Sequence, residues 1–360
     1  MSRHAAAKAP LLKPVPKPSL DTKAAPASDK VDNCWLATAT AAAPATSQAV
    51  PMPRKNWHLF QAGYAKSTTD RYRSATQDFT AWCKASGLKA QTFEELDVLL
   101  TDYVHDLYDA NDGRGRQKAV NTVYGCQMFM PQCKDKLPLA TQAVARWSKK
   151  HPSISHPPLQ WEAAVLMAVQ LARHKQFRYA VALLLAFDCM LRIEEFMQLK
   201  KCDVADGAGS ALGARYRAVT LRLATTKTGK DQSVNVRQDC VKTLLRQVLA
   251  ETKDSQGKLF PGGAAAFRAW FVRVRNELGL NDRLVPHSLR HGGATWRFLA
   301  GESVENIMVE GRWASSKSAR TYIQKSRAVL LANAIPSKLA KTAANLAEDV
   351  VLSIALAQKH

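Results

Sequence analysis

The stretch that most constrains the fold is residues 287–322, where apolar residues recur at helical spacing. The pattern begins after Pro286 and is interrupted at Gly301, as expected where helices begin and end. Its apolar positions are Phe298, Val304, Ile307, Met308 and Trp313. The stretch therefore predicts two short helices and then a third, which carries Tyr322.

The same stretch contains an imidazole, a guanidinium and a phenol, at His287, Arg290 and Tyr322. A phenol has a pKa of about 10, so it is a poor nucleophile unless a neighbour removes its proton or stabilises the developing charge. A guanidinium can donate two parallel hydrogen bonds to phosphate oxygens. These groups suit covalent attack on a phosphodiester. The alternative interpretation is a helical core with a histidine and a tyrosine at its rim.

The net charge of +21 over 360 residues indicates a polyanionic partner: DNA, RNA or, less well, an anionic membrane. The longest apolar run, residues 180–191, is too short to cross a bilayer and contains Asp188. The first residues have no apolar stretch of the kind found in secretory signals. We therefore expect a nucleic-acid partner and no membrane.

The seven cysteines are scattered, and none forms a Cys-x-x-Cys pair or lies beside a histidine at zinc spacing. An odd number of unpatterned cysteines is not typical of a disulfide framework or a structural zinc site. We expect a reducing compartment.

Composition and periodicity divide the chain into five segments. Residues 1–55 are rich in alanine, proline, lysine, serine and threonine, which predicts a disordered basic tail. Residues 56–152 read as a helical module, and residues 153–158 as a proline-broken linker. Residues 159–335 form a second domain, and residues 336–360 a terminal amphipathic helix. In the first module four helices are expected: from Ser67 or Thr68 to Ser86, 94–108, 117–130 and 139–150.

In the second domain, residues 159–173 predict a helix, and residues 177–189 a helix that is apolar nearly all round and therefore buried. Alternating residues at 218–224 and 233–237, joined by a turn with glycine, predict a β-hairpin. Further helices are expected at 241–251, 264–278 and 337–356.

Arg192 and Glu195 directly follow the buried helix, three residues apart. A buried arginine requires a partner, so the pair is either structural or a carboxylate that orients an arginine towards a phosphate.

Four sequence boxes occur in one order: LRIEE at 191–195, TKTGK at 226–230, HSLRHGGA at 287–294 and GRWASSKSARTY at 311–322. In this order they resemble the tyrosine recombinase (phage integrase) family, with a catalytic domain similar to that of Cre recombinase. The Gly-Arg-Trp box also resembles recombinases of eukaryotic mobile elements. The resemblance implies a mostly α-helical, two-domain architecture with a small β-sheet or hairpin. Residues 56–152 would be the helical, DNA-binding core-binding domain, and residues 159–335 the α+β catalytic domain.

The resemblance also implies a role for each matching residue. Arg192 and Arg290 would clamp the scissile phosphate, and Glu195 would orient Arg192. Two guanidiniums and a lysine would supply the charge stabilisation that a metal ion supplies elsewhere, so neither a metal nor a cofactor is expected.

The remaining assignments concern proton transfer and attack. Lys227 would protonate the leaving 5′ oxygen, although Lys230 is three residues away and is the alternative. His287 would accept the tyrosine proton, and Trp313 would support the phosphate through its indole N–H and by packing. Tyr322 would be the nucleophile that forms a 3′-phosphotyrosine link. His291, next to Arg290, is not expected to take part.

The expected function is therefore site-specific DNA recombination or integration. The partners would be double-stranded DNA and three further copies of the chain, as a homotetramer on paired DNA sites. The alternatives are a catalytically inactive DNA-binding relic of a mobile element, or less well a type IB topoisomerase-like enzyme.

The protein is expected inside the cell with DNA: the nucleus in a eukaryote, the cytoplasm or nucleoid in a bacterium. The helix at 336–360 would dock on a neighbouring protomer, or else fold back onto its own domain.

Overall fold

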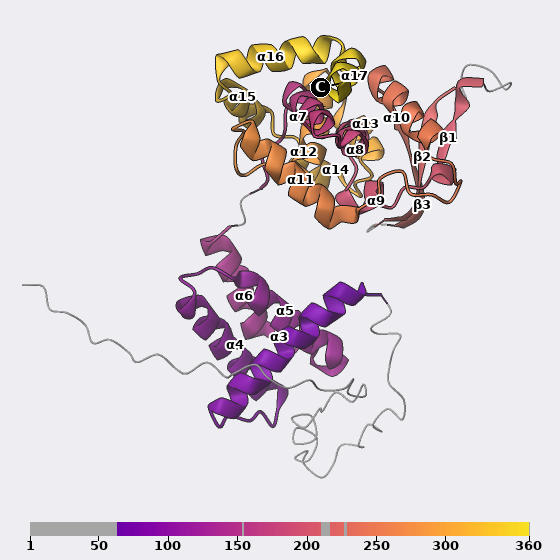
Figure 1. Cartoon of the computed structure of the whole chain (residues 1–360). Coiled ribbons are helices and arrows are strands. Elements are labelled where there is room, and N and C mark those ends of the chain that lie inside the picture. Colours follow the sequence, from indigo (N-terminus) through magenta and orange to yellow (C-terminus); the bar gives the residue numbers. More distant parts are fainter. Residues whose placement is uncertain (1–62, 153–154, 210–216, 227–228, 360) are drawn as a thin grey trace, which may run out of the picture. The chain divides into compact units, whose positions relative to one another are not determined.

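The structure is a computed structural model that describes residues 63–152, 155–209, 217–226 and 229–359. These residues form two compact units, of which 63–152 belong to the first and 155–359 to the second (Figure 1). The tail expected at residues 1–55 lies outside the described residues. None of the described helices is long and apolar enough to cross a membrane. The expected mostly helical fold with one small sheet is confirmed.

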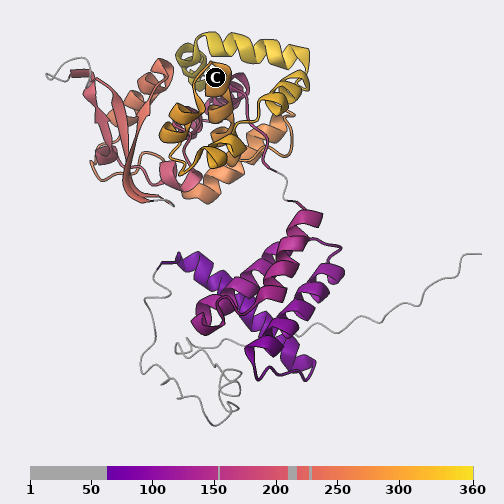
Figure 2. The same ribbon diagram turned by 180° about the vertical axis from the view of Figure 1, so that it is seen from behind.

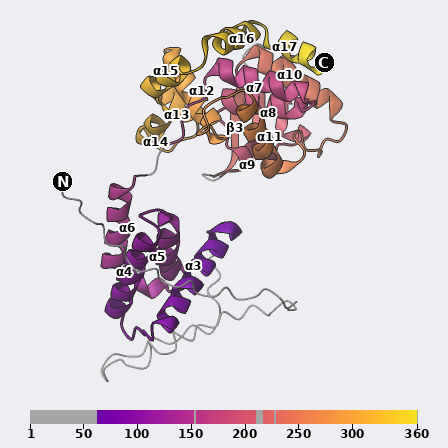
Figure 3. The same ribbon diagram turned by 60° about the vertical axis from the view of Figure 1, so that its left-hand side comes forward.

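The first unit is built from helices in the order expected. They are α3 (Lys66–Ala85), α4 (Phe93–Ala110), α5 (Arg116–Phe129), the 3-10 turn η1 (Pro131–Cys133) and α6 (Pro138–Lys150). Helix α3 packs against α5, and α4 packs against α6, around a core that includes Phe79, Leu100 and Tyr103 (Figure 3). Four amphipathic helices thus bury their apolar faces against one another.

The start of α3 differs from the expectation that Ser67 or Thr68 would cap it. The helix begins at Lys66 and its N-cap is Ala65, two or three residues before the expected cap, and an alanine side chain cannot accept a hydrogen bond. By contrast, α4 has a side-chain cap: Thr92 accepts from the backbone N–H of Glu95, and the Glu95 side chain accepts from the backbone N–H of Gln91, the residue before the cap. A serine near a helix start is therefore a weaker signal than a threonine with a glutamate three residues later.

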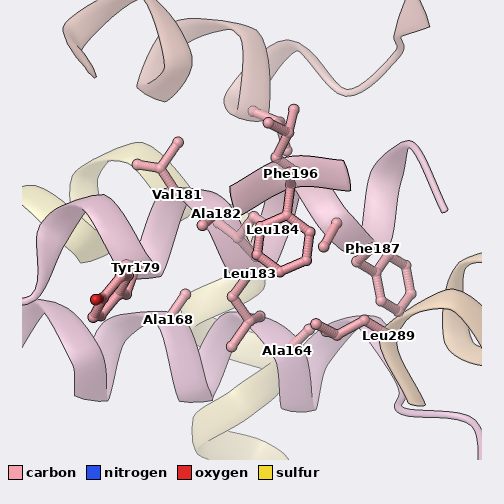
Figure 4. Close-up of a cluster of buried hydrophobic side chains, with 14 of the residues drawn as sticks. Ala164, Ala168, Tyr179, Val181, Ala182, Leu183, Leu184, Phe187, Phe196 and Leu289 are labelled. Carbon is pink, nitrogen blue, oxygen red and sulfur yellow. The ribbon is translucent and has the colours of Figure 1, made fainter. Parts of the chain in front are cut away.

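The second unit is organised around two buried helices. These are α7 (Trp161–Arg173) and α8 (Phe177–Asp188), and nearly every residue of α8 is buried, as its apolar sequence predicts. Figure 4 shows Leu183 of α8 lying over α7 near Ala164 and Ala168, whose small side chains let the helices approach. The other helices of this unit pack on this pair or on α12 (His287–Leu299). They are α9 (Ile193–Met197), α10 (Asp239–Glu251), α11 (Gly263–Glu277), α12, α13 (Val304–Glu310), α14 (Ser316–Tyr322), α15 (Lys325–Asn333), α16 (Ser337–Glu348) and α17 (Val350–Lys359).

A three-stranded antiparallel sheet follows α9 in the sequence (Figure 2). Two short 3-10 turns, η2 (Lys201–Asp203) and η3 (Gly207–Gly209), flank its first strand. The strands are β1 (Val204–Asp206), β2 (Val219–Thr226) and β3 (Gly229–Val236). The expected hairpin is β2–β3, in which Val219 pairs with Val236 and Thr226 with Gly229. Leu221 and Leu223 are buried while Arg222 between them is exposed, which is the alternation that predicted the strand.

The terminal segment differs from the single helix expected at 337–356. It divides at Asp349 into α16 and α17, and both pack against α7 of the same chain (Figure 3). Val350, Ile354 and Ala357 belong to the core of the second unit, and Leu339 packs against it. The apolar face of this segment thus folds back onto its own domain, which is the second of the two arrangements expected for it. A contact between protomers through other faces of this segment stays a prediction.

Helix α12 lies unusually close to the backbone of its neighbours. A β-carbon at Gly292 would lie 2.1 Å from the carbonyl oxygen of Leu159, and one at Gly293 would lie 2.2 Å from that of Phe187. Because no real side chain fits at such distances, both positions require glycine. This contact fixes α12 directly against the start of α7 and the end of α8.

Candidate active site

The first part of the site is the pair formed by Arg192 and Glu195. Met190 adopts a left-handed conformation (φ 49°) after α8, and Arg192 then caps α9. Glu195 accepts hydrogen bonds from the backbone N–H of Arg192 at 2.9 Å and from its Nη1 at 2.6 Å. The side chain of Glu195 is 3% exposed and that of Arg192 is 21% exposed. The carboxylate is therefore buried, while its arginine keeps an open side.

A second arginine shares the same carboxylate. Nη2 of Arg312 donates to Oε2 of Glu195 at 2.8 Å, and the Arg312 side chain is 6% exposed. Arg312 adopts the left-handed conformation, with φ 57°. Burial lowers the pKa of Arg312, and the Glu195 carboxylate opposes this shift. Glu195 thus lies between two guanidiniums.

Arg290 lies on α12 and is completely buried. Its Nη1 donates to the carbonyl of Met190, and its Nη2 donates to that of Gly311 at 2.5 Å. Its Nε is buried and has no acceptor among the described residues. Burial, and then the positive charges of Arg192 and Arg312, lower the pKa of Arg290 to about 9. The guanidinium is still charged at neutral pH, so the site holds positive charge in excess.

Two aromatic rings cover the guanidinium of Arg290. Its central carbon lies 4.4 Å from the ring centroid of Trp313 and 5.4 Å from that of Tyr322. The two rings are 4.7 Å apart. A β-carbon at Gly311 would collide with the indole, so glycine is required there. The indole Nε1 of Trp313 is buried without an acceptor among the described residues, so its hydrogen bond to phosphate stays a prediction.

Two histidines flank the ring of Tyr322. The His287 ring lies edge-on at 5.5 Å, and the His291 ring stacks on it at 4.5 Å. Nε2 of Gln324 lies 2.9 Å from Nδ1 of His291, within hydrogen-bonding distance. Burial, and then the neighbouring His287, lower the pKa of His291 to about 3. His291 is therefore neutral at physiological pH and supports Tyr322 by packing.

Hydrogen bonds to α12 hold the backbone at Tyr322. Tyr322 is the last residue of α14, a helix capped by Ser315 through the backbone N–H of Ser318. The hydroxyl of Thr295 donates to the carbonyl of Tyr322 at 3.1 Å and accepts from the N–H of Gln324 at 3.0 Å. One side chain of α12 thus fixes the chain on both sides of residue 323, while the phenol stays half-buried.

The structure brings six of the seven expected site residues together around Tyr322. They are Arg192, Glu195, His287, Arg290, Trp313 and Tyr322. Lys227 lies outside the described residues. The backbone of Lys230 pairs with Thr225 in the hairpin, so the choice between the two lysines stays a prediction. No cluster of three metal-ligating side chains occurs in the described part of the chain.

The sequence interpretation missed Arg312 and the stacking role of His291. Both residues lie inside the boxes that pointed to the site, at positions next to Trp313 and Arg290. For Arg312 the signal was a basic residue directly after Gly311, in a turn. Its partner Glu195 is 117 residues away, so only the folded structure pairs them.

Comparisons with known proteins give both a family match and a fold match. Residues 160–328 match the model of the phage integrase family. No curated protein sequence matches the chain. The structure of the Tn1549 transposon integrase with transposon right end DNA has a TM-score of 0.53 and 13% identity, over 77% of this chain and 98% of that chain. A lambda integrase dimer bound to a COC′ core site has a TM-score of 0.50 and 17% identity, over 74% of each chain. At these identities the likeness is one of fold.

Proposed function

The chain belongs to the phage integrase family of tyrosine recombinases, and from this we propose that it cuts and rejoins double-stranded DNA through a covalent 3′-phosphotyrosine link. The observation that carries the proposal is the setting of Tyr322. Its phenol lies over the buried guanidinium of Arg290 and beside His287. A phosphodiester that entered this setting would meet a nucleophile, a proton acceptor and positive charge together.

The proposed step is a transfer of one phosphoester bond. The oxygen of Tyr322 bonds to phosphorus as the bond to the 5′ oxygen breaks. His287 takes the phenolic proton, and Lys227 gives a proton to the 5′ oxygen. In the return step a 5′ hydroxyl attacks the phosphotyrosine and restores the free phenol. The link conserves the phosphodiester, so rejoining requires no external energy source.

The two clamping arginines would act mainly in the transition state. Negative charge on the phosphate oxygens increases as the tyrosine attacks, and fixed guanidiniums stabilise it without reorganising. Arg192 has an open side, whereas Arg290 lies beneath the rings of Trp313 and Tyr322. We therefore propose that DNA binding shifts α14, so that the phosphate reaches Arg290 as the phenol moves from the guanidinium to the phosphorus.

DNA would also contact the first unit, which we propose is the core-binding domain. Arg114 and Lys149 are exposed there and suit phosphate contacts. Arg73 and Lys118 already pair with acidic side chains, Asp70 at 3.3 Å and Asp78 at 2.8 Å, so they suit this role less well. We further propose that four copies act on paired DNA sites, since strand exchange between two duplexes requires four cuts.

The buried charge argues against an inactive relic. A cluster of buried guanidiniums with unpaired nitrogens costs stability. In a chain that no longer catalyses a reaction, substitutions that replace these buried arginines would raise stability and would be retained. A recombinase would keep the arginines because it uses their charge.

The proposal is tested with duplexes that carry a randomised centre and a nick, which lets the cleaved fragment diffuse away. The wild-type protein should form a DNA adduct that survives denaturation and is destroyed by protease. Tyr322→Phe should bind the same DNA and form none, because only the phenolic oxygen is lost. DNA binding without an adduct in the wild type would support the relic. An adduct in Tyr322→Phe would exclude Tyr322. Relaxation of supercoiled DNA without strand exchange would support the topoisomerase-like alternative.

A further inference from the structure

We propose that Arg312 is a positioning residue that neutralises Glu195 and so leaves Arg192 its full positive charge for the scissile phosphate. This inference rests on the proposed function, and it adds a third arginine to the two that clamp the phosphate. Arg312 acts through the carboxylate and does not itself touch the phosphate.

The geometry is that of one carboxylate divided between two arginines. Oε1 of Glu195 accepts from Nη1 of Arg192 at 2.6 Å, and Oε2 accepts from Nη2 of Arg312 at 2.8 Å. Glu195 and Arg312 are both nearly inaccessible to solvent, whereas Arg192 is partly open. Water therefore screens the first two charges poorly, and each depends on the other for compensation.

The charge balance explains why a second arginine is required. Glu195 holds Arg192 in place, yet a buried carboxylate in contact with a guanidinium also cancels much of its field at the phosphate. Arg312 brings a compensating positive charge to the far oxygen of that carboxylate. Arg192 thus keeps the orientation that Glu195 gives it, and the site as a whole keeps the positive excess that also lowers the pKa of Arg290.

The backbone supports a dedicated role for Arg312. Its φ of 57° lies in the left-handed region, where glycine is unstrained and a residue with a side chain is strained. Arg312 also lies between Gly311, whose carbonyl holds Arg290, and Trp313, which covers it. The chain accepts strain at this position and gains a guanidinium that reaches Glu195.

The experiment measures single-turnover adduct formation on the nicked duplexes, with DNA affinity and thermal unfolding measured on the same preparations. R312Q should slow adduct formation roughly 10- to 100-fold, less than the ~10²–10³-fold loss typical of a direct charge-stabilising group. DNA affinity should change less than about threefold, because other phosphate contacts hold the duplex. R312K, which keeps the charge, should lie closer to the wild type than R312Q.

The decisive comparison is the double variant E195Q/R312Q. If Arg312 acts by compensating Glu195, removing the carboxylate from R312Q should restore part of the lost rate, since Arg192 is no longer neutralised. If Arg312 only supports the fold, the second substitution should add a further loss or leave the rate unchanged, and that result would overturn the inference. If R312Q alone folds poorly, the double variant is compared with E195Q instead: an equal rate supports compensation, because no carboxylate is left to compensate, and a lower rate in the double variant overturns it.

A matched control breaks another arginine–glutamate pair, whose glutamate lies on the same short helix α9 and whose arginine lies on α11. Nη2 of Arg268 lies 3.2 Å from Oε1 of Glu194, and both side chains are exposed. R268Q should leave the rate within about twofold of the wild type, because exposed pairs contribute little.

A wild-type protein that forms no adduct would refute the proposed function. A wild-type protein that forms an adduct at the same rate as R312Q would refute the role of Arg312 and leave the proposed function standing.

Discussion

Replacing Ile354 with alanine tests whether the terminal helices belong to the core of their own chain. Ile354 is completely buried on α17, which packs against α7 and α10. The substitution removes three carbon atoms, worth about 2.4 kcal/mol in transfer free energy at ~0.8 kcal/mol each. The cavity that remains adds to this, so we expect a total loss of about 2–5 kcal/mol in the free energy of unfolding.

For a unit of this size the loss corresponds to a fall in Tm of roughly 5–20 °C. The assay is thermal unfolding followed by circular dichroism at two protein concentrations that differ tenfold. A contact within one chain gives a fall in Tm that does not depend on concentration. The control is Leu352→Ala on the outer face of the same helix, where the side chain is 54% exposed and the change should stay within about 0.5 kcal/mol.

Two results would refute this reasoning. One is an unchanged Tm for Ile354→Ala, which would mean that α17 is not part of the core. The other is an equal loss for Leu352→Ala that appears only at high concentration or on DNA, which would identify a contact between protomers. On the present packing, a chain that ends at Pro336 should fail to fold stably, because it uncovers α7.

Three further predictions concern the site. Arg192→Ala or Arg290→Ala should slow adduct formation about 10²–10³-fold while DNA affinity changes little; an equal loss of both in gel-shift and adduct assays would contradict the clamp. Because burial lowers the pKa of Arg290 to about 9, the adduct rate at low DNA concentration should fall as pH rises through about 9, and a rate that stays flat to about pH 10 would contradict this. The pKa of His291 is about 3 in the fold, below the ordinary histidine value of 6.5, so between these pH values the unfolded chain binds a proton that the folded chain does not. Stability should therefore be lost as pH falls from 6.5 towards 3, and urea midpoints at pH 7 and 4.5 should differ less in His291→Asn than in the wild type.

The sequence predicted the helices and strands in which apolar residues recur regularly over many positions. Helix α8 is an example, since it is apolar nearly all round and is buried nearly all round. Strand β1 was missed because its three residues are too few to show an alternating pattern. Only their pairing with β2 makes them a strand. The division of the terminal segment did have a local signal: Asp349 accepts from the backbone N–H of Leu352, as an N-cap does. The continuing apolar pattern on both sides hid it.

The site was predictable where its contacts are local in the chain. Arg192 and Glu195 are three residues apart, so their pairing could be inferred from spacing. The partners of Arg290 could not, because two backbone carbonyls hold it and any residue type supplies a carbonyl. Arg312 was missed for the same physical reason: its partner comes from a distant part of the chain.

The contact made by Gly292 and Gly293 determines which side of the site can adjust during a reaction. Helix α12, which carries His287 and Arg290, is in direct contact with backbone carbonyls on its far side. It therefore cannot move away from the site. Helix α14, by contrast, is short and joined to α12 through hydrogen bonds at Thr295. The proposed proton acceptor and one proposed clamping arginine thus lie on a fixed helix, and the proposed nucleophile lies on a helix that can shift. Substitutions that tune the timing of cleavage should therefore accumulate around residues 314–324.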